Sequence, residues 1–129
     1  DITLEQAFDF AGREGTFSPP WRNLGTFAQR VSLESRQMPL VVGVPQVRGW
    51  DFELTLPRSW RALTESGKVE AQSECSSLSR ETTGRSGRIV MRQMLRSLCE
   101  RITPEQYEDE RRFSLQADTI RDAPIRVRR

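Results

Sequence analysis

Four arginines recur at every third or fourth position in the C-terminal half of the chain, at Arg85, Arg88, Arg92 and Arg96. On a helix, side chains three and four residues apart project from one flank, so this spacing predicts a ridge of guanidinium groups. Adjacent like charges repel one another unless nearby anions neutralise them. Because a guanidinium group binds carboxylates and phosphates through paired hydrogen bonds, the ridge predicts a surface for an acidic protein or a nucleic acid.

An acidic segment of the same chain could neutralise these arginines without any ligand. Residues 105–110 are rich in acids and open the next predicted helix, so a helical hairpin would bring them beside the ridge. The arginine bias itself has two explanations. Lys68 is the single lysine among 20 basic residues, which indicates either an arginine-dependent surface or the codon usage of a GC-rich genome.

A second group of arginines lies in the tail, at Arg126, Arg128 and Arg129. The run Arg126-Val127-Arg128-Arg129 resembles the Arg-x-Arg-Arg recognition site of furin-type processing proteases. The resemblance implies an alternative function, that of a secreted pro-segment or polyprotein fragment, and with it a disulfide between the two cysteines. The tail also adds to a charge asymmetry, because residues 1–79 carry a net charge of −2 and residues 80–129 a net charge of +4.

The chain contains no histidine. This excludes Ser-His-Asp and Cys-His catalysis within the chain. Two cysteines are too few for a zinc site of the usual kind, and the eight glycines form no phosphate-binding or dinucleotide-binding fingerprint. We therefore predict no catalytic residues, no cofactor and no metal, and keep a carboxylate-dependent enzyme as an alternative.

Helix signals appear at three places. Thr3 and Gln6 form a capping box that predicts a helix over residues 3–11. The arginine-bearing segment predicts a second helix over residues 88–101, with an apolar stripe beside the arginines. The third helix, over residues 104–117, has the clearest start. Thr103 is its cap, Pro104 takes the first position and Gln106 completes a capping box.

Strand signals lie between residues 24 and 56. The run Trp50–Leu56 alternates apolar and polar residues, so we expect its apolar side chains to face the core and Asp51, Glu53 and Thr55 to face solvent. Residues 26–33 and 40–44 predict further strands. We therefore predict an α+β fold, in which a small antiparallel sheet from about residues 24–56 packs with an N-terminal helix and two C-terminal helices.

The length of 129 residues predicts a single domain spanning the whole chain. Residues 73–87 are polar and rich in serine, which predicts a mobile loop, and residues 122–129 predict a loose basic tail. Cys75 and Cys99 are expected to be free thiols, with a disulfide as the alternative. No apolar run approaches the ~18 residues that a membrane span needs.

These observations favour a non-catalytic binding or assembly subunit. Its Arg-rich C-terminal helix and tail are expected to contact an acidic partner, either a protein or a nucleic acid. The residues predicted for this contact are Arg85, Arg88, Arg92, Arg96, Arg126, Arg128 and Arg129.

Overall fold

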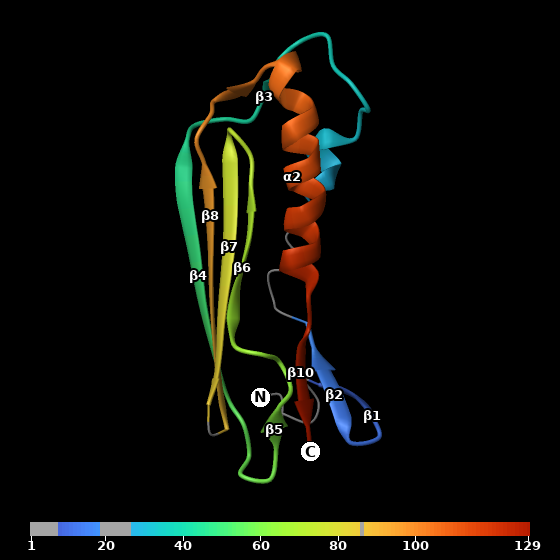
Figure 1. Cartoon of the computed structure of the whole chain (residues 1–129), viewed down its shortest axis with the longest axis vertical. Coiled ribbons are helices and arrows are strands. Elements are labelled where there is room, and N and C mark those ends of the chain that lie inside the picture. Colours follow the sequence, from blue (N-terminus) through green and yellow to red (C-terminus); the bar gives the residue numbers. More distant parts are fainter. Residues whose placement is uncertain (1–7, 19–26, 86) are drawn as a thin grey trace.

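Antiparallel strands form most of the molecule, and one long helix runs beside them (Figure 1). The structure is a computed structural model that describes residues 8–18, 27–85 and 87–129. In chain order the elements are β1 (Asp9–Ala11), β2 (Glu14–Phe17), the 3₁₀ helix η2 (Ala28–Val31), β3 (Leu40–Val41), β4 (Gln46–Thr55), β5 (Arg61–Ala62), β6 (Gly67–Gln72), β7 (Ser76–Arg85), β8 (Arg88–Ser97), β9 (Arg101–Ile102), α2 (Pro104–Asp122) and β10 (Ile125–Arg128).

The largest sheet has four antiparallel strands in the order β4-β8-β7-β6. β7 and β8 form a hairpin whose register runs without interruption from Ser76 opposite Ser97 to Arg85 opposite Arg88. Gly87 closes the hairpin with φ +79, a conformation that favours glycine. β4 pairs with β8 along the whole length of both strands.

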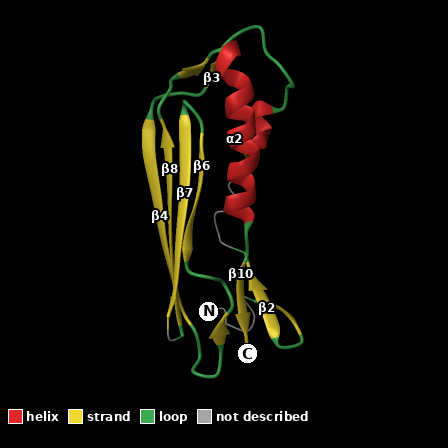
Figure 2. Ribbon diagram, in the orientation of Figure 1, coloured by secondary structure: helices red, strands yellow, loops and turns green. Residues whose placement is uncertain are grey.

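One face of the large sheet, the inner face, is covered by the rest of the molecule. Side chains alternate along each strand, so every second residue of β7 and β8 points to this side. Figure 2 shows α2 lying beside the upper half of the sheet, with the short strands β2 and β10 below it and β3 at its upper end. Around α2 the core contains Ala71, Leu78, Phe113 and Ala117. Around the short strands it contains Phe8, Leu56, Trp60, Ile89, Met91, Ile125 and Val127.

A second four-stranded sheet, β1-β2-β10-β5, covers the lower half of the inner face. Its central strand β10 follows directly on α2 and pairs with β2 on one side and β5 on the other. Ile125 and Val127 are fully buried, whereas Arg126 and Arg128 are exposed. The prediction of a loose tail over residues 122–129 is therefore wrong, because this tail completes a sheet.

Helix α2 confirms the third helix prediction. The side chain of Thr103 accepts a hydrogen bond from the backbone N–H of Gln106, and the side chain of Gln106 accepts one from the backbone N–H of Thr103. Pro104 begins the helix, which ends at Asp122 rather than at residue 117. Among the described residues, no helix is both long enough and apolar enough to cross a membrane.

The predicted α+β fold with three helices is wrong, because strands dominate the described residues and α2 is the single α-helix among them. Residues 88–97, predicted as a helix, form the strand β8. Of the predicted helix over residues 3–11, residues 9–11 form β1 and residues 3–7 lie outside the described residues. β8 lies between β4 and β7, and its residues Ile89 and Met91 are buried in the core on the inner face. Strand pairing and burial together outweigh the local helix propensity.

The strand predictions are partly correct. Trp50–Thr55 lies in β4, with Trp50, Phe52 and Leu54 packed against the core and Asp51 and Glu53 exposed, as expected. Of the strand predicted over residues 40–44, only residues 40–41 form β3. Within the strand predicted over residues 26–33, residues 28–31 form η2 instead. The sheet is also not local to residues 24–56, because β4 pairs with β8 and the other two strands of this sheet, β6 and β7, come from residues 67–85.

A carboxylate on α2 explains why residues 28–31 form a 3₁₀ helix instead of a strand. The carboxylate of Asp118 accepts hydrogen bonds from the backbone N–H groups of Phe27 and Ala28, at 2.7 and 2.9 Å. Such a contact satisfies the free N–H groups at a helix start. Asp118 lies 90 residues after Ala28 in the sequence, so the local pattern of residues did not indicate this contact.

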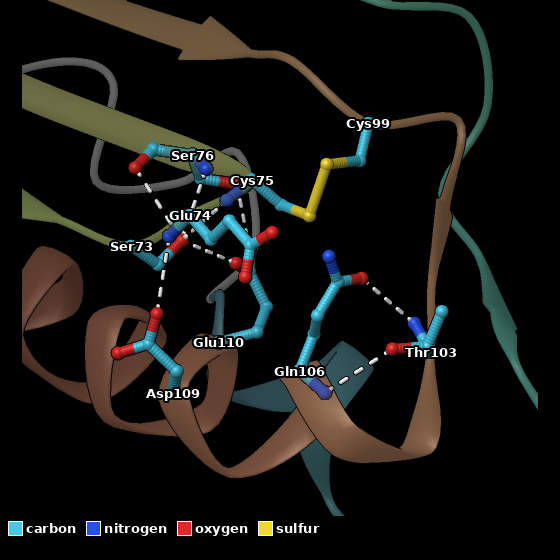
Figure 3. The surroundings of a disulfide bond; sticks show 9 residues. All are labelled: Ser73, Glu74, Cys75, Ser76, Cys99, Thr103, Gln106, Asp109 and Glu110. Carbon is cyan, nitrogen blue, oxygen red and sulfur yellow. Dashed lines mark hydrogen bonds between the residues drawn. A yellow bond between two sulfur atoms is a disulfide. The ribbon is translucent and has the colours of Figure 1, made fainter.

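The predicted mobile loop over residues 73–87 is wrong, because residues 76–85 form β7, a central strand of the large sheet. Polar side chains there are satisfied by the helix. Glu110 of α2 is 1% exposed, and its carboxylate accepts hydrogen bonds from the hydroxyls of Ser73 (2.6 Å) and Ser76 (2.7 Å), as Figure 3 shows. Residues 61–62 form β5.

The two cysteines form a disulfide, so the prediction of free thiols is wrong. Cys75 precedes β7 and Cys99 follows β8, with Cα atoms 5.0 Å apart (Figure 3). The backbone N–H of Leu98 donates to the carbonyl oxygen of Cys75 at 2.8 Å, which aligns the two segments. The disulfide therefore joins the two central strands at the end of the sheet next to the start of α2.

Candidate functional site

The four arginines of the predicted ridge do share one surface, although it is a sheet face and not a helix flank. Arg88, Arg92 and Arg96 are spaced by four, an even number, so on the strand β8 they point to the same side. Arg85 lies directly opposite Arg88 in the hairpin. All four are exposed on the side of the large sheet turned away from α2, which we call the outer face.

Acidic residues on the edge strand β4 form ion pairs with two of these arginines. Arg92 lies opposite Asp51 and contacts its carboxylate at 2.9 Å. Arg88 contacts Glu53 at 2.6 Å. The Arg88 hydrogen bond is the main reason why the pKa of Glu53 is lowered, and the same contact raises the pKa of Arg88.

The predicted intramolecular partner, residues 105–110, does not serve this role. Asp109 contacts Arg112 at 2.5 Å and accepts a hydrogen bond from the backbone N–H of Glu74. Glu110 is buried against the β6–β7 turn, as described above. The acidic turn therefore stabilises α2 and its contact with the sheet, on the other side from the arginines.

One row of the outer face alternates in charge across all four strands. The strand registers place Asp51, Arg92, Glu81 and Lys68 side by side, one from each strand. Lys68 also contacts Glu70 at 2.8 Å, and this hydrogen bond, with a smaller contribution from Glu81, raises its pKa. Opposite charges in direct cross-strand positions stabilise a sheet, so this row is largely neutralised from within.

Arg85 and Arg96 stand at the two ends of the outer face. Within the described part of the chain, neither side chain contacts an acidic group. Arg96 lies beside Met94 and opposite Ser77, at the rim of a shallow hollow of about 370 Å³. The hollow is also lined by Lys68, Glu70, Gln72, Ser79, Glu81 and Arg92. These two arginines are the ones left available to an external anion.

The tail arginines belong to a different surface. Arg126 and Arg128 lie on the exposed side of β10, and Arg126 contacts Glu14 at 3.4 Å. Arg129 donates a hydrogen bond to the carbonyl oxygen of Gly12 and lies 4.1 Å from the ring centroid of Phe10. The structure thus separates the seven predicted arginines into an outer-face group and a small-sheet group.

Arg80 is a charged residue that sequence reasoning missed. It lies on the inner side of β7, is 5% exposed, and donates to the carbonyl oxygen of Ile120 at the end of α2. Burial lowers its pKa to about 10. A cation near a helix C-terminus is favoured by the helix dipole, so Arg80 joins the helix end to the sheet. Only its even spacing from Ser76 and Leu78 within a strand would have revealed this orientation.

Groups of three or more cysteine, aspartate or glutamate side chains arranged to hold a metal ion are absent from residues 8–18, 27–85 and 87–129. The arrangement on the outer face is instead suited to reversible contact through charged hydrogen bonds.

Comparisons with known proteins identify the fold alone. No protein-family model matches the chain, and no curated protein matches it. Among solved structures, it is similar to a protein from Parabacteroides distasonis named as a "putative protease", with 14% identity and a TM-score of 0.75. The match covers 99% of this chain and 25% of that protein, so this chain spans about a quarter of its length.

Proposed function

We propose that this chain is a non-catalytic interaction module whose outer face contacts an acidic surface of a partner protein. The main observation that supports this proposal is the difference between the two faces of the large sheet. Its inner face is covered by α2 and the small sheet, whereas its outer face has charged side chains on every strand and no buried side chain. A sheet face that is not needed for the core is available for contact with another molecule.

The size of the outer face supports this proposal. Its longest strands have ten residues, so the face is about 33 Å long and, with four strands ~4.8 Å apart, about 15 Å wide. That area is a large part of the ~800 Å² that each partner contributes to a stable protein–protein interface. Side chains at the rim would supply the remainder.

The charge pattern favours a protein over a nucleic acid. A nucleic-acid surface needs basic residues that follow the phosphates without acids between them. Here Asp51, Glu53 and Glu81 lie among the arginines and would repel phosphates. A protein surface that places acids opposite Arg85 and Arg96 fits both ends of the face and leaves the internal ion pairs intact.

The similarity to a quarter of a larger protein supports a role as one module among others. The disulfide supports an oxidising compartment, where such bonds persist. The processing-site alternative receives less support, because Arg126–Arg128 are paired in a central strand and a protease would reach them only after β10 left the sheet.

Site-specific photo-crosslinking tests the proposal. A photoreactive amino acid replaces Arg96 on the outer face, and in a matched control it replaces Glu105, which is exposed on α2. Expressed in its native host, the Arg96 variant is expected to form a discrete adduct with one protein, and the control is not. Equal adducts from both positions, no adduct from Arg96, or an adduct with nucleic acid would contradict the proposal.

A further inference from the structure

A separate hollow at the end of the small sheet is lined almost entirely by arginine. Among the described residues, four arginines and one serine line a volume of about 360 Å³, and none of the lining residues is acidic. The lining residues are Arg13, Ser59, Arg61, Arg128 and Arg129. They come from the β1–β2 turn, the β4–β5 connection, β5 and the end of β10, which the small sheet brings together (Figure 1).

Backbone pairing holds these arginines close together. Arg61 and Arg128 are direct cross-strand partners, both exposed on the same side of the small sheet. Like charges in that position destabilise a sheet. The backbone N–H of Arg129 donates to the carbonyl oxygen of Arg13 at 2.8 Å, which ties the other two arginines to each other. Backbone pairing therefore fixes these arginines beside one another.

Glu14 neutralises only part of the positive charge beside the hollow. Glu14 lies opposite Arg128 in the strand register, but its carboxylate contacts Arg126 at 3.4 Å. The guanidinium group of Arg129 is held by the carbonyl oxygen of Gly12 and the ring of Phe10, which are neutral groups. Among the described residues, positive charge in the hollow therefore exceeds the negative charge around it.

We propose that this hollow binds an oxyanion group with two negative charges, of the kind found in phosphate monoesters of sugars. Guanidinium groups bind such oxygens through paired, charge-assisted hydrogen bonds, and the hydroxyl of Ser59 adds a donor. The ligand relieves the repulsion between Arg61 and Arg128, which a single carboxylate with one charge does only in part. The volume lies at the lower end of the range for small-ligand sites, which suits a sugar-sized ester.

Calorimetric titration of the whole chain at low ionic strength tests the site. The probes are glucose 6-phosphate, glucose 6-sulfate, glucose and acetate. Glucose 6-phosphate is expected to bind saturably with one site and more tightly than the singly charged glucose 6-sulfate, whereas glucose and acetate are not expected to bind. The double variant Arg61→Gln/Arg128→Gln is expected to weaken ester binding at least tenfold. Arg101→Gln, an exposed arginine of β9 at the far end of the molecule, is expected to leave it unchanged.

Lowering the pH separates the two esters. A phosphate monoester loses its second charge below its second pKa, about 6, whereas a sulfate ester keeps its single charge and its three oxygens. Stronger binding of the phosphate at pH 7.5, lost at pH 5, therefore identifies charge as the selecting property. Equal affinity of the double variant and the parent chain, binding of acetate or glucose 6-sulfate as tight as that of glucose 6-phosphate at pH 7.5, or no saturable binding of glucose 6-phosphate would overturn the proposal. Circular dichroism of the double variant checks that its fold is retained.

This site is independent of the outer face. The crosslinking experiment at Arg96 and the titrations at Arg61 and Arg128 use different surfaces, so either proposal can fail without affecting the other.

Discussion

Arg92 on β8 and Asp51 on β4 are direct cross-strand neighbours, and their side chains meet at 2.9 Å on the outer face of the large sheet. The two residues are 41 positions apart in sequence. From the sequence, the guanidinium group of Arg92 is predicted to bind an external ligand. In the structure it forms an ion pair with Asp51 of the same chain instead. Arg85 and Arg96, at the ends of the face, contact no acidic side chain within the described part of the chain.

Removing the Asp51 carboxylate tests how much this ion pair stabilises the fold. Both side chains are mostly exposed, at 67% and 73%, so solvent screens the interaction. We expect Asp51→Asn to lower the free energy of unfolding by less than ~1 kcal/mol, and the effect to vanish at 1 M salt. Urea denaturation at two salt concentrations measures this. The same substitution in an Arg92→Gln background is the control, and a loss there as large as in the parent would mean that the pair is not the cause.

The buried carboxylate of Glu110 is expected to matter more. Glu110→Gln exchanges one acceptor oxygen for a donor facing two hydroxyls, so one buried polar group loses its partner. We expect a loss of about 1–3 kcal/mol in the free energy of unfolding. Glu108→Gln, at an exposed position of the same helix, is expected to be nearly neutral. Similar losses from both variants would show that burial of Glu110 is not decisive.

Loss of the disulfide is expected to destabilise the chain substantially. The cysteines are 24 residues apart, so in the chain-entropy model the closed loop contributes ~3–4 kcal/mol. Cys75→Ser/Cys99→Ser should therefore unfold at a lower urea concentration than the parent. Reductant should lower the stability of the parent and leave the double variant unaffected. A parent whose unfolding ignores reductant would contradict the prediction.

Acid should weaken the tie between α2 and the β6–β7 turn through Asp109. Hydrogen bonds from Arg112 and from the backbone N–H of Glu74 lower the pKa of this carboxyl. A carboxyl whose pKa is lower in the folded state stabilises the fold above its unfolded pKa, 3.8, and this stabilisation is lost as the pH falls through the folded pKa. We expect Asp109→Asn to lose less stability than the parent between pH 5 and pH 3. NMR titration of the carboxyl carbon tests the pKa directly, and a value above 3.8 would refute the argument.

The start of α2 and the alternation of β4 were predictable from the sequence because both depend on local interactions. Thr103, Pro104 and Gln106 satisfy the first turn of the helix by themselves. The alternation over Trp50–Thr55 separates a core side from a solvent side wherever the strand is placed. These two segments therefore kept in the tertiary structure the conformation that their residues favour alone.

The conformation of residues 76–97 was decided only by the tertiary structure. A spacing of four places Arg88, Arg92 and Arg96 on one side of a helix or a strand alike, so the pattern alone did not choose between them. The choice came from distant partners. β4 pairs with β8, and the carboxylate of Glu110 satisfies the hydroxyls that made residues 73–76 resemble a loop.

The grouping of arginines was likewise a tertiary outcome. Arg61 and Arg128 lie 67 positions apart and become neighbours only because β10 follows α2 back to β5. From the sequence alone one can conclude that this chain lacks histidine and is rich in arginine. Strand register decides which arginines form ion pairs with acids and which ones line the arginine-rich hollow. The reason is that register sets which charged side chains stand opposite each other.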